Sequence, residues 1–314
     1  MLEYSDFRRK ESDYHVVKID SPQDFDIWYA DAESKPHIIY RGVSNSKYRL
    51  YNSAQRLWIG REFINIKSKN ENPYLSFIQS LIGNCKIWHN GLLDKYFSAL
   101  NVPLSDIMLL AIMQHYGLPT PLLDFTKNIN IALYFALNNI NQNNFDRDIN
   151  SYASIYSINL ENNTKSITFL SNLYKSSGDA ILSLNNLMSA ERLIYLDSES
   201  INLLKFIHYS NLNIINQEGV LLFNYHPFLY LAGWNERQYN ARLNITFESK
   251  RPDFSPDITV LEDIQCMHIH KSLKEYITNK YLLSYNDNYI FPSYASMKDF
   301  ALSKTLQNID EIFK

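Results

Sequence analysis

Cysteine is scarce in this sequence of 314 residues, which contains only Cys85 and Cys266. Two thiols so far apart do not form the disulfide framework of a small secreted domain, so we expect a reducing compartment, the cytoplasm. Long apolar runs are also missing, and no stretch approaches the ~18 residues of a membrane-spanning helix. The first residues, MLEYSDFRRKESDYH, are polar and do not resemble a secretion signal. We therefore expect no membrane association.

Positive charge is not in excess either, because the formal net charge is −3. The chain as a whole is therefore not a basic nucleic-acid binder, although a local basic patch is compatible with this total. The sequence also lacks GxGxxG, GxxxxGK[ST], HExxH and GxSxG. The usual nucleotide cradles, zinc hydrolases and serine hydrolases therefore have no motif in this chain.

One stretch, CMHIHKS, has the residue types of a metal site. Cys266, His268 and His270 alternate along a predicted strand and would share one of its faces. The outer two would lie ~13 Å apart in an extended strand, too far to hold one ion together. A neighbouring pair would need further ligands from elsewhere in the chain, so we expect no metal site.

The sequence does contain enough apolar side chains for a full core. Its composition is 46% hydrophobic and 14% aromatic, which suits one large or two medium domains. Predicted helices and strands are interleaved without a regular βα alternation, and this favours an α+β protein over a doubly wound sheet. Ser21 and Ser105 are expected to cap helices, and Gly117 to end one. We interpret residues 1–314 as a single domain, with largely helical insertions at about 55–112 and 160–212 and a helical C-terminal segment at about 271–314.

The first candidate for a functional role is the stretch IIYRGVSNSKYRL, residues 38–50. A short apolar strand ends there on Arg41, and Gly42 follows. Arginine presents a rigid fork of donors that suits phosphate or carboxylate, and glycine would let a ligand approach the backbone. The alternative is an ordinary surface arginine beside a turn.

The second candidate is the run QHYGLPTPLLDFTKNINIALYFA, residues 114–136. His115 and Tyr116 end one predicted helix, while Asp124 and Thr126 end a strand that leads into the next helix. Side chains at such junctions face the rim of a sheet, where ligands commonly bind. The alternatives are a helix cap at Thr126, a turn former at Asp124 and a histidine bonded to a nearby carbonyl.

The third candidate is the pair Gln217 and Glu218, which precedes a predicted strand, VLLF. An amide and a carboxylate at this point could form hydrogen bonds with the hydroxyl groups of a sugar. Successive residues of a strand point to opposite faces, so only one of the two would face a site. The alternative is a polar edge followed by a turn at Gly219.

Taken together, these stretches resemble the FRG domain, a family named for a Phe-Arg-Gly tripeptide. Tyr40, Arg41 and Gly42 stand for that tripeptide, and QHYGLPTPLLDFTKNINIALYFAL is similar to the family's most specific signature. NIINQEGVLLF and a Phe-Pro pair near the C-terminus are similar to later elements. The resemblance extends from about residue 14 to 303.

The layout of the family is similar to that of ADP-ribosyltransferases, which implies a split antiparallel sheet core and NAD as substrate. In this chain the resemblance implies catalytic roles for Arg41, Thr126, Gln217 and Glu218. Arginine would hold the diphosphate, and a carboxylate would stabilise the oxocarbenium-like sugar that forms as nicotinamide leaves. Tyr116 or Tyr134 would stack on the nicotinamide ring, although the pair Tyr134 and Phe135 also reads as core. The residues implied in binding NAD are Arg41, Gly42, His115, Tyr116, Asp124, Thr126 and Tyr134.

The resemblance thus implies an NAD-dependent ADP-ribosyltransferase. The heavy use of Asn, Ile, Lys and Tyr is typical of AT-rich coding, and in that setting we expect a toxin of an anti-phage or toxin–antitoxin system, with an antitoxin as partner. We favour a nucleic-acid acceptor such as RNA over protein, because RGVSNSKYRLYNSAQRLW interleaves cations with aromatic rings.

Two alternatives belong to other classes of protein. One is a sensor module that binds a nucleotide or nucleic acid without catalysis. It is supported by Pro121 and Asn213, which stand where the family has arginine, and by the adjacency of Gln217 and Glu218. The other is a structural or partner-binding protein in which the same polar groups are caps and turns.

Overall fold

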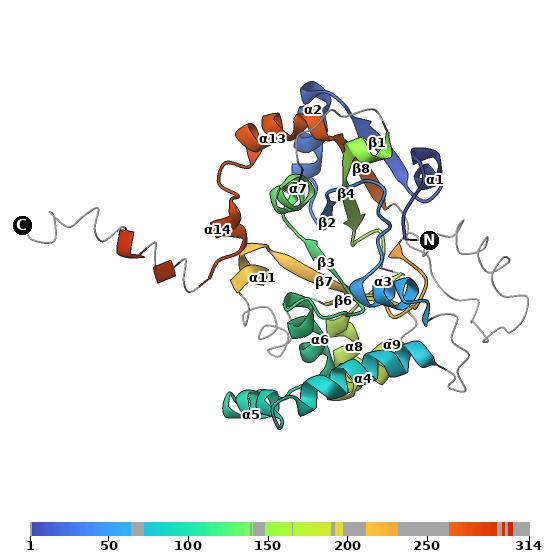
Figure 1. The fold of residues 1–314 in the computed structure, drawn as a ribbon, viewed down its shortest axis with the longest axis vertical. Helices are drawn as coiled ribbons and strands as arrows, with labels where there is room; N and C mark the ends of the chain where they lie inside the picture. The colour runs from blue at the N-terminus through green and yellow to red at the C-terminus, as the bar shows by residue number, and fades with distance from the viewer. Residues whose placement is uncertain are drawn as a thin grey trace, which may run out of the picture.

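The computed structural model describes residues 2–63, 72–138, 140, 148–164, 166–189, 192–196, 212–231, 264–293, 297–298 and 301–303. Within these ranges the chain is an α+β protein with helices on both sides of one eight-stranded sheet (Figure 1). The predicted fold class is confirmed at this level. None of the described helices is both long and apolar enough to cross a membrane.

The sheet has the strand order β1-β8-β4-β2-β3-β7-β6-β5. Its inner pairs are antiparallel, whereas β1 with β8 and β5 with β6 are parallel. The expected antiparallel core is therefore mixed at both edges. The strands are β1 (His15–Ile19), β2 (Ile38–Val43), β3 (Leu122–Thr126), β4 (Tyr152–Asn159), β5 (Ile167–Phe169), β6 (Leu193–Leu196), β7 (Gly219–Phe223) and β8 (Gln265–His270).

Strands β2 and β3 share fewer paired residues than any other two neighbouring strands described in the sheet. Among the described residues, only Tyr40 and Thr126 are paired between them. The expectation that this strand ends on Arg41 is wrong, because β2 continues to pair with β4 as far as Val43, and Arg41 lies opposite Tyr156. The two strands therefore diverge next to Arg41, and the sheet consists of two halves joined at a single point.

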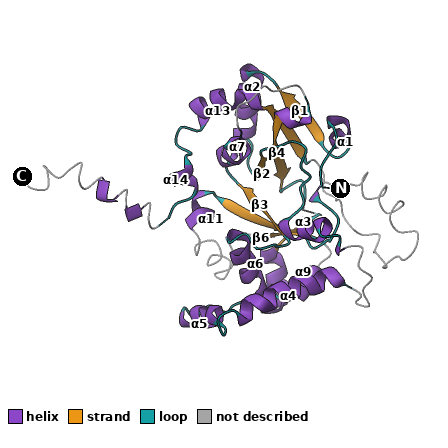
Figure 2. Cartoon of the chain, viewed as in Figure 1, coloured by secondary structure: helices purple, strands orange, loops and turns teal. Residues whose placement is uncertain are grey.

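Helices gather in two groups, which Figures 1 and 2 show at the top and bottom of the view. Near β1, β8, β4 and β2 lie α1 (Phe7–Glu11), α2 (Pro22–Glu33), α7 (Ile129–Leu137) and α13 (Lys274–Tyr281). Below β3, β7 and β6 lie α4 (Pro73–Ile87), α5 (Leu92–Ala99), α6 (Asp106–His115), α8 (Leu170–Ser177) and α9 (Leu184–Ser189). The remaining described helices are α3 (Ser53–Gly60), α11 (Leu212–Asn216), α14 (Asp287–Ile290) and the short 3-10 helices Ile149–Ser151, Gly178–Leu182 and Lys271–Leu273.

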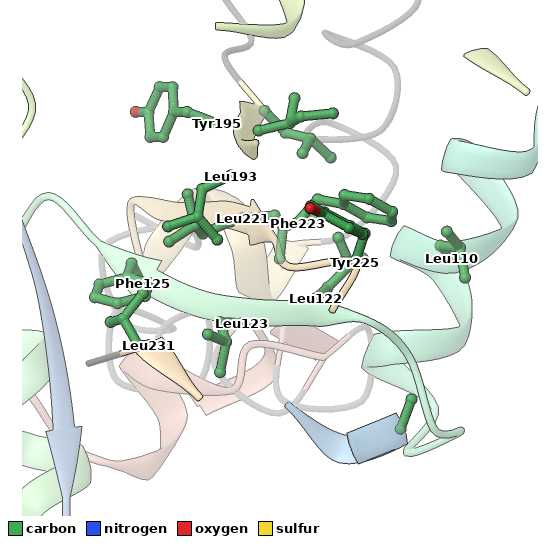
Figure 3. Packing of buried hydrophobic residues seen from close by; sticks show 14 of the residues in the cluster. Leu110, Leu122, Leu123, Phe125, Leu193, Tyr195, Leu221, Phe223, Tyr225 and Leu231 are labelled. Atoms are coloured by element: carbon green, nitrogen blue, oxygen red, sulfur yellow. The ribbon is translucent and has the colours of Figure 1, made fainter. Parts of the chain in front are cut away.

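Alternation along β2 and β4 divides the apolar side chains between two cores, because neighbouring strand residues point to opposite faces. Ile39 packs in the larger core, whereas Tyr40 packs in a second core with Phe25 of α2 and Leu133 of α7. The larger core continues under the other half of the sheet (Figure 3). There, side chains from β3, β6 and β7 interlock, including Leu122, Leu123, Phe125, Leu193, Tyr195, Leu221 and Phe223.

Several helix boundaries agree with the sequence predictions. The Ser21 hydroxyl accepts a hydrogen bond from the Asp24 amide at 3.2 Å and caps α2. Ser105 caps α6 in the same way, through the amide of Met108 at 3.3 Å. Gly117 follows the end of α6 with a φ of +75°, a left-handed conformation that favours glycine.

The segment expected to be a largely helical insertion, at about 160–212, also contributes two strands to the sheet. Helices α8 and α9 lie there, but so do β5 and β6, which extend the sheet at one edge. All four residues of Leu193–Leu196 are buried, so the strand shows no polar alternation. A short continuous apolar run of this kind cannot be told from a buried helical segment by its periodicity. Residues 197–211 lie outside the described ranges.

Candidate functional site

A cavity of about 420 Å³ lies where β2 and β3 diverge. Segments that are distant in the sequence meet there: strands β2 and β3, the end of α6, helix α7, the turn between α11 and β7, and the residue after α14. Of the predicted site residues, this cavity brings together Arg41, Gly42, His115, Asp124, Thr126 and Gln217. The other lining residues are Tyr40, Val43, Ser44, Gln114, Phe125, Phe135, Asn213 and Phe291.

Arg41 extends from β2 across the gap to β3. Its Nη1 donates a hydrogen bond to the main-chain carbonyl of Asp124, and the same nitrogen lies 3.8 Å from the Asp124 Oδ2. Its Nε is buried and has no hydrogen-bond partner among the described residues. Burial lowers the pKa of the guanidinium and the Asp124 charge opposes that shift, yet an arginine stays charged at any ordinary pH. Most buried polar groups in proteins have a hydrogen-bond partner, so this Nε is an exception.

Asp124 supplies a carboxylate to the cavity, and its side chain is half exposed. The Gln114 Nε2 donates to Asp124 Oδ2 at 2.7 Å, and the hydroxyl of Thr120 donates in turn to Gln114 Oε1. This chain of hydrogen bonds fixes the orientation of the carboxylate next to Arg41. The amide of Gln114 was not singled out from the sequence, although it directly precedes His115 in the quoted motif.

Thr126 lines the cavity, but its hydroxyl is bonded to the main chain. The Oγ1 donates to the carbonyl of Gln217 at 2.6 Å and accepts from the amide of Asn128 at 3.0 Å. It therefore ties the end of β3 to the turn before β7. The side chain is buried, and its hydroxyl stabilises this turn by bonding only to the main chain. Thr126 does not cap α7, because the cap is Asn128, whose side chain accepts from the amide of Asn130 at 2.9 Å.

Gln217 and Glu218 lie in the turn between α11 and β7, not on the strand. Gln217 lines the cavity, and its Nε2 donates to the carbonyl of Ile290 at 3.0 Å. Glu218 is not among the lining residues within the described ranges. Its Oε1 accepts from Asn128 Nδ2 at 2.7 Å, and its φ of +44° is a left-handed conformation in the turn that leads into β7.

Gly42 is required by helix packing. A Cβ added there would lie 1.8 Å from the carbonyl oxygen of Ala132 and 2.8 Å from the amide nitrogen of Ala136, both in α7. The backbone of α7 therefore occupies the space that a side chain would need. Gly42 does line the cavity, but its missing side chain makes room for this helix and not for a ligand.

The aromatic side chains of the cavity differ from those expected. Tyr116 is 82% exposed, and Tyr134 is buried with its hydroxyl donating to Asp287; neither lines the cavity in the part of the chain described. Phe135 and Phe291 line it instead, with ring centroids 6.1 Å apart and an interplanar angle of 76°. The prediction that Phe135 belongs to the core is therefore wrong. The only indication of Phe291 in the sequence was its place in the Phe-Pro pair that resembles the family's closing segment.

Cys266, His268 and His270 all lie on β8. Across the described ranges, no three His, Cys, Asp or Glu side chains come together as metal ligands. His268 is buried in the sheet, and its Nδ1 lies 3.0 Å from the Ser46 hydroxyl and 2.9 Å from that of Ser154. Burial, reinforced by nearby lysines, lowers the pKa of His268 to about 2.

Comparison with protein families identifies residues 36–145 as an FRG domain. This range includes β2, β3 and α7, and with them Arg41, Asp124 and Thr126. The turn that carries Gln217 lies outside the matched range, as does Phe291. No curated protein and no solved structure matches the chain.

Proposed function

We propose that this chain, with its FRG domain over residues 36–145, is an NAD-dependent ADP-ribosyltransferase whose site is the cavity between β2 and β3. The observation that carries the proposal is the placement of Arg41 beside Asp124. The Arg41 guanidinium has one donor, Nε, without a partner among the described residues and is suited to bind a diphosphate. The Asp124 carboxylate, held in place by Gln114, is suited to stabilise a positive charge that develops on the substrate. The divergence of the sheet at this point provides the space for both.

The reaction breaks the bond between C1′ of the ribose and the nicotinamide nitrogen, and nicotinamide leaves as a neutral molecule. A nucleophile of the acceptor forms the new bond at C1′, and its proton passes to a base. Positive charge develops on the sugar in between, as in glycoside hydrolysis. Asp124 is the carboxylate of the cavity, so in this proposal it stabilises that charge and accepts the proton, in place of Glu218.

The amide of Gln217 would form a hydrogen bond with a ribose hydroxyl, and Phe135 with Phe291 would provide the faces on which a ring stacks. Thr126 would act by fixing the position of Gln217, because its hydroxyl binds the carbonyl of that residue. Each of these roles uses a side chain that lines the same cavity.

Isotope-labelled NAD tests the proposal directly. The wild-type chain should release nicotinamide and transfer label to RNA, DNA or protein from a cell extract. Asp124→Asn should lower the rate by on the order of 10²-fold with NAD affinity largely retained, because it removes a charge that acts in the transition state. Glu218→Gln is the matched control and should leave the rate unchanged. Loss of activity in Glu218→Gln, with Asp124→Asn active, would reverse the assignment.

A second candidate is a binding module that holds a nucleotide without chemistry. It is favoured by the Thr126 hydroxyl, which is committed to the main chain, and by the position of Glu218 outside the lining. This candidate predicts saturable binding of NAD with no release of nicotinamide by the wild-type chain. Measuring both NAD binding and nicotinamide release with the labelled NAD therefore separates the two functions.

A toxin activity with an RNA acceptor and an antitoxin partner is part of the proposal. The stretch that suggested RNA has two of its aromatic side chains, Tyr51 and Trp58, in the core. Tyr48 remains exposed and lies under the Lys47 ammonium at 5.4 Å from the ring centroid. Label recovered in RNA from intact cells would support this acceptor, whereas label confined to protein would replace it.

A further inference from the structure

A second cavity, of about 310 Å³, lies beside the first. Arg41 and Val43 line both cavities, so the two share a wall. The second cavity also receives Arg49, from the loop after β2, and Arg56, from α3. Its other lining residues are Leu2, Glu3, Tyr48, Leu50 and Tyr51.

Positive charge dominates this second cavity. Among the lining residues that the structure describes there are three arginines and one carboxylate, that of Glu3. The Glu3 Oε1 lies 3.4 Å from the ammonium of Lys47, so its charge is already balanced by another cation. The Asp124 carboxylate approaches Arg41 from the first cavity and is not part of this lining. Arg41 therefore has a carboxylate partner only on the side of the first cavity, and among the described lining residues Arg49 and Arg56 have no carboxylate of their own in this cavity.

Two of these guanidinium groups have hydrogen-bonding capacity left over. Arg49 lies over the rings of Tyr4 and Tyr230, with its Cζ 4.6 and 5.2 Å from their centroids. Such stacking leaves the donors at the edge of the guanidinium free to bind an anion. The Nε of Arg49 is buried and, like that of Arg41, has no hydrogen-bond partner in the described ranges. A pair of unsatisfied buried donors at one cavity points to a ligand with several acceptors.

Arg56 is the most accessible of the three. One of its nitrogens, Nη1, donates to the carbonyl of Tyr51 at 3.1 Å, which anchors the side chain at the cavity. Burial of the guanidinium and, after it, the like charge of Arg41 lower the pKa of Arg56. Two positive charges close enough to oppose each other would both be relieved by an anion bound between them.

We propose that the second cavity is the diphosphate subsite of a nucleotide whose sugar and ring lie in the first cavity. Arg41 would contact the diphosphate from the wall common to both cavities, while Arg49 and Arg56 would bind its outer oxygens. The identity of the ligand as a nucleotide rests on the proposed function. The binding of a diphosphate in this cavity does not depend on catalysis. Planar guanidinium groups are the side chains that bind phosphate with two parallel hydrogen bonds.

Calorimetric titration of the full chain with inorganic pyrophosphate, at constant ionic strength set with chloride, tests the anion site. Arg56→Gln should raise the dissociation constant about tenfold or more, because it removes a charge-assisted hydrogen bond. Arg61→Gln is the matched control: it removes the same charge at the C-terminal end of α3, outside the lining. Equal affinity in wild type and Arg56→Gln, or an equal loss in Arg61→Gln, would overturn the proposal.

Competition with ADP-ribose identifies the source of the phosphate. If the diphosphate belongs to the nucleotide, pyrophosphate should displace ADP-ribose, and Arg56→Gln should weaken both ligands. Simultaneous binding of the two would overturn the assignment to the nucleotide and leave a separate site for free anions. If pyrophosphate binding depends on Arg56 but the chain releases no nicotinamide from NAD, the diphosphate subsite is supported and the proposed enzymatic activity is refuted.

Discussion

Substitution of Gly42 by alanine tests how the Tyr40-Arg41-Gly42 stretch is used. The added methyl would overlap the carbonyl oxygen of Ala132, at 1.8 Å, and press on the amide nitrogen of Ala136, at 2.8 Å. Both atoms belong to the backbone of α7, so neither can rotate away, and the helix itself must move. Overpacking in a core costs about 1–3 kcal/mol, and a clash with backbone belongs at the upper end. We therefore expect a loss of about 3 kcal/mol in the free energy of unfolding.

Urea-induced and thermal unfolding measure this loss. At about 2 °C per kcal/mol for a chain of this size, Gly42→Ala should lower the Tm by about 6 °C. Gly83→Ala is a control of opposite sign, since Gly83 lies inside α4 and no described atom comes within 4 Å of an added Cβ. It should stabilise the protein by about 0.4–1 kcal/mol. A Gly42→Ala variant as stable as the wild type, with weaker ligand binding, would refute the packing role.

Further predictions concern acidity and ligand binding. Burial lowers the pKa of His226 to about 3, and that of His268 lies near 2, while the unfolded chain takes up these protons near pH 6.5. Their contribution to stability is complete above pH 6.5 and is lost below it, by about 1.4 kcal/mol per pH unit for each histidine, as urea unfolding between pH 7 and 4 would show. A flat profile would contradict their neutral burial. Phe291→Ala should raise the dissociation constant for NAD about fivefold through lost stacking, measured by calorimetry, and an unchanged constant would remove this ring from the site. Arg41→Lys should weaken NAD binding about tenfold or more, because an ammonium lacks the fork that reaches both Asp124 and a diphosphate; equal affinity would exclude Arg41 as a ligand-binding group.

Local signals in the sequence predicted the elements that depend on few residues. Ser21 and Ser105 cap helices because each needs only the amide three residues later. The apolar start of β2 and the helix after Thr126 follow from their apolar patterns in the same way, although β2 itself continues through Arg41 to Val43. These features depend on residues close together in the sequence, so they can be predicted from the sequence.

Long-range packing decided the rest. The role of Gly42 depends on a helix that begins almost ninety residues later, and no local pattern shows that Ala132 would lie against it. Which of Gln217 and Glu218 faces the cavity depends on a turn in which Glu218 has a left-handed backbone conformation. The sequence predicts a strand for both residues and therefore does not reveal this turn. Phe291 reaches the cavity only because the chain after α14 returns to it.

A crystal structure of the full chain with ADP-ribose tests the central claim most directly. The account predicts the sugar between Asp124 and Gln217, and the diphosphate within hydrogen-bond distance of Arg41 on the side of Arg56. A ligand bound away from the divergence of β2 and β3, with the Arg41 Nε still unpaired, would contradict it.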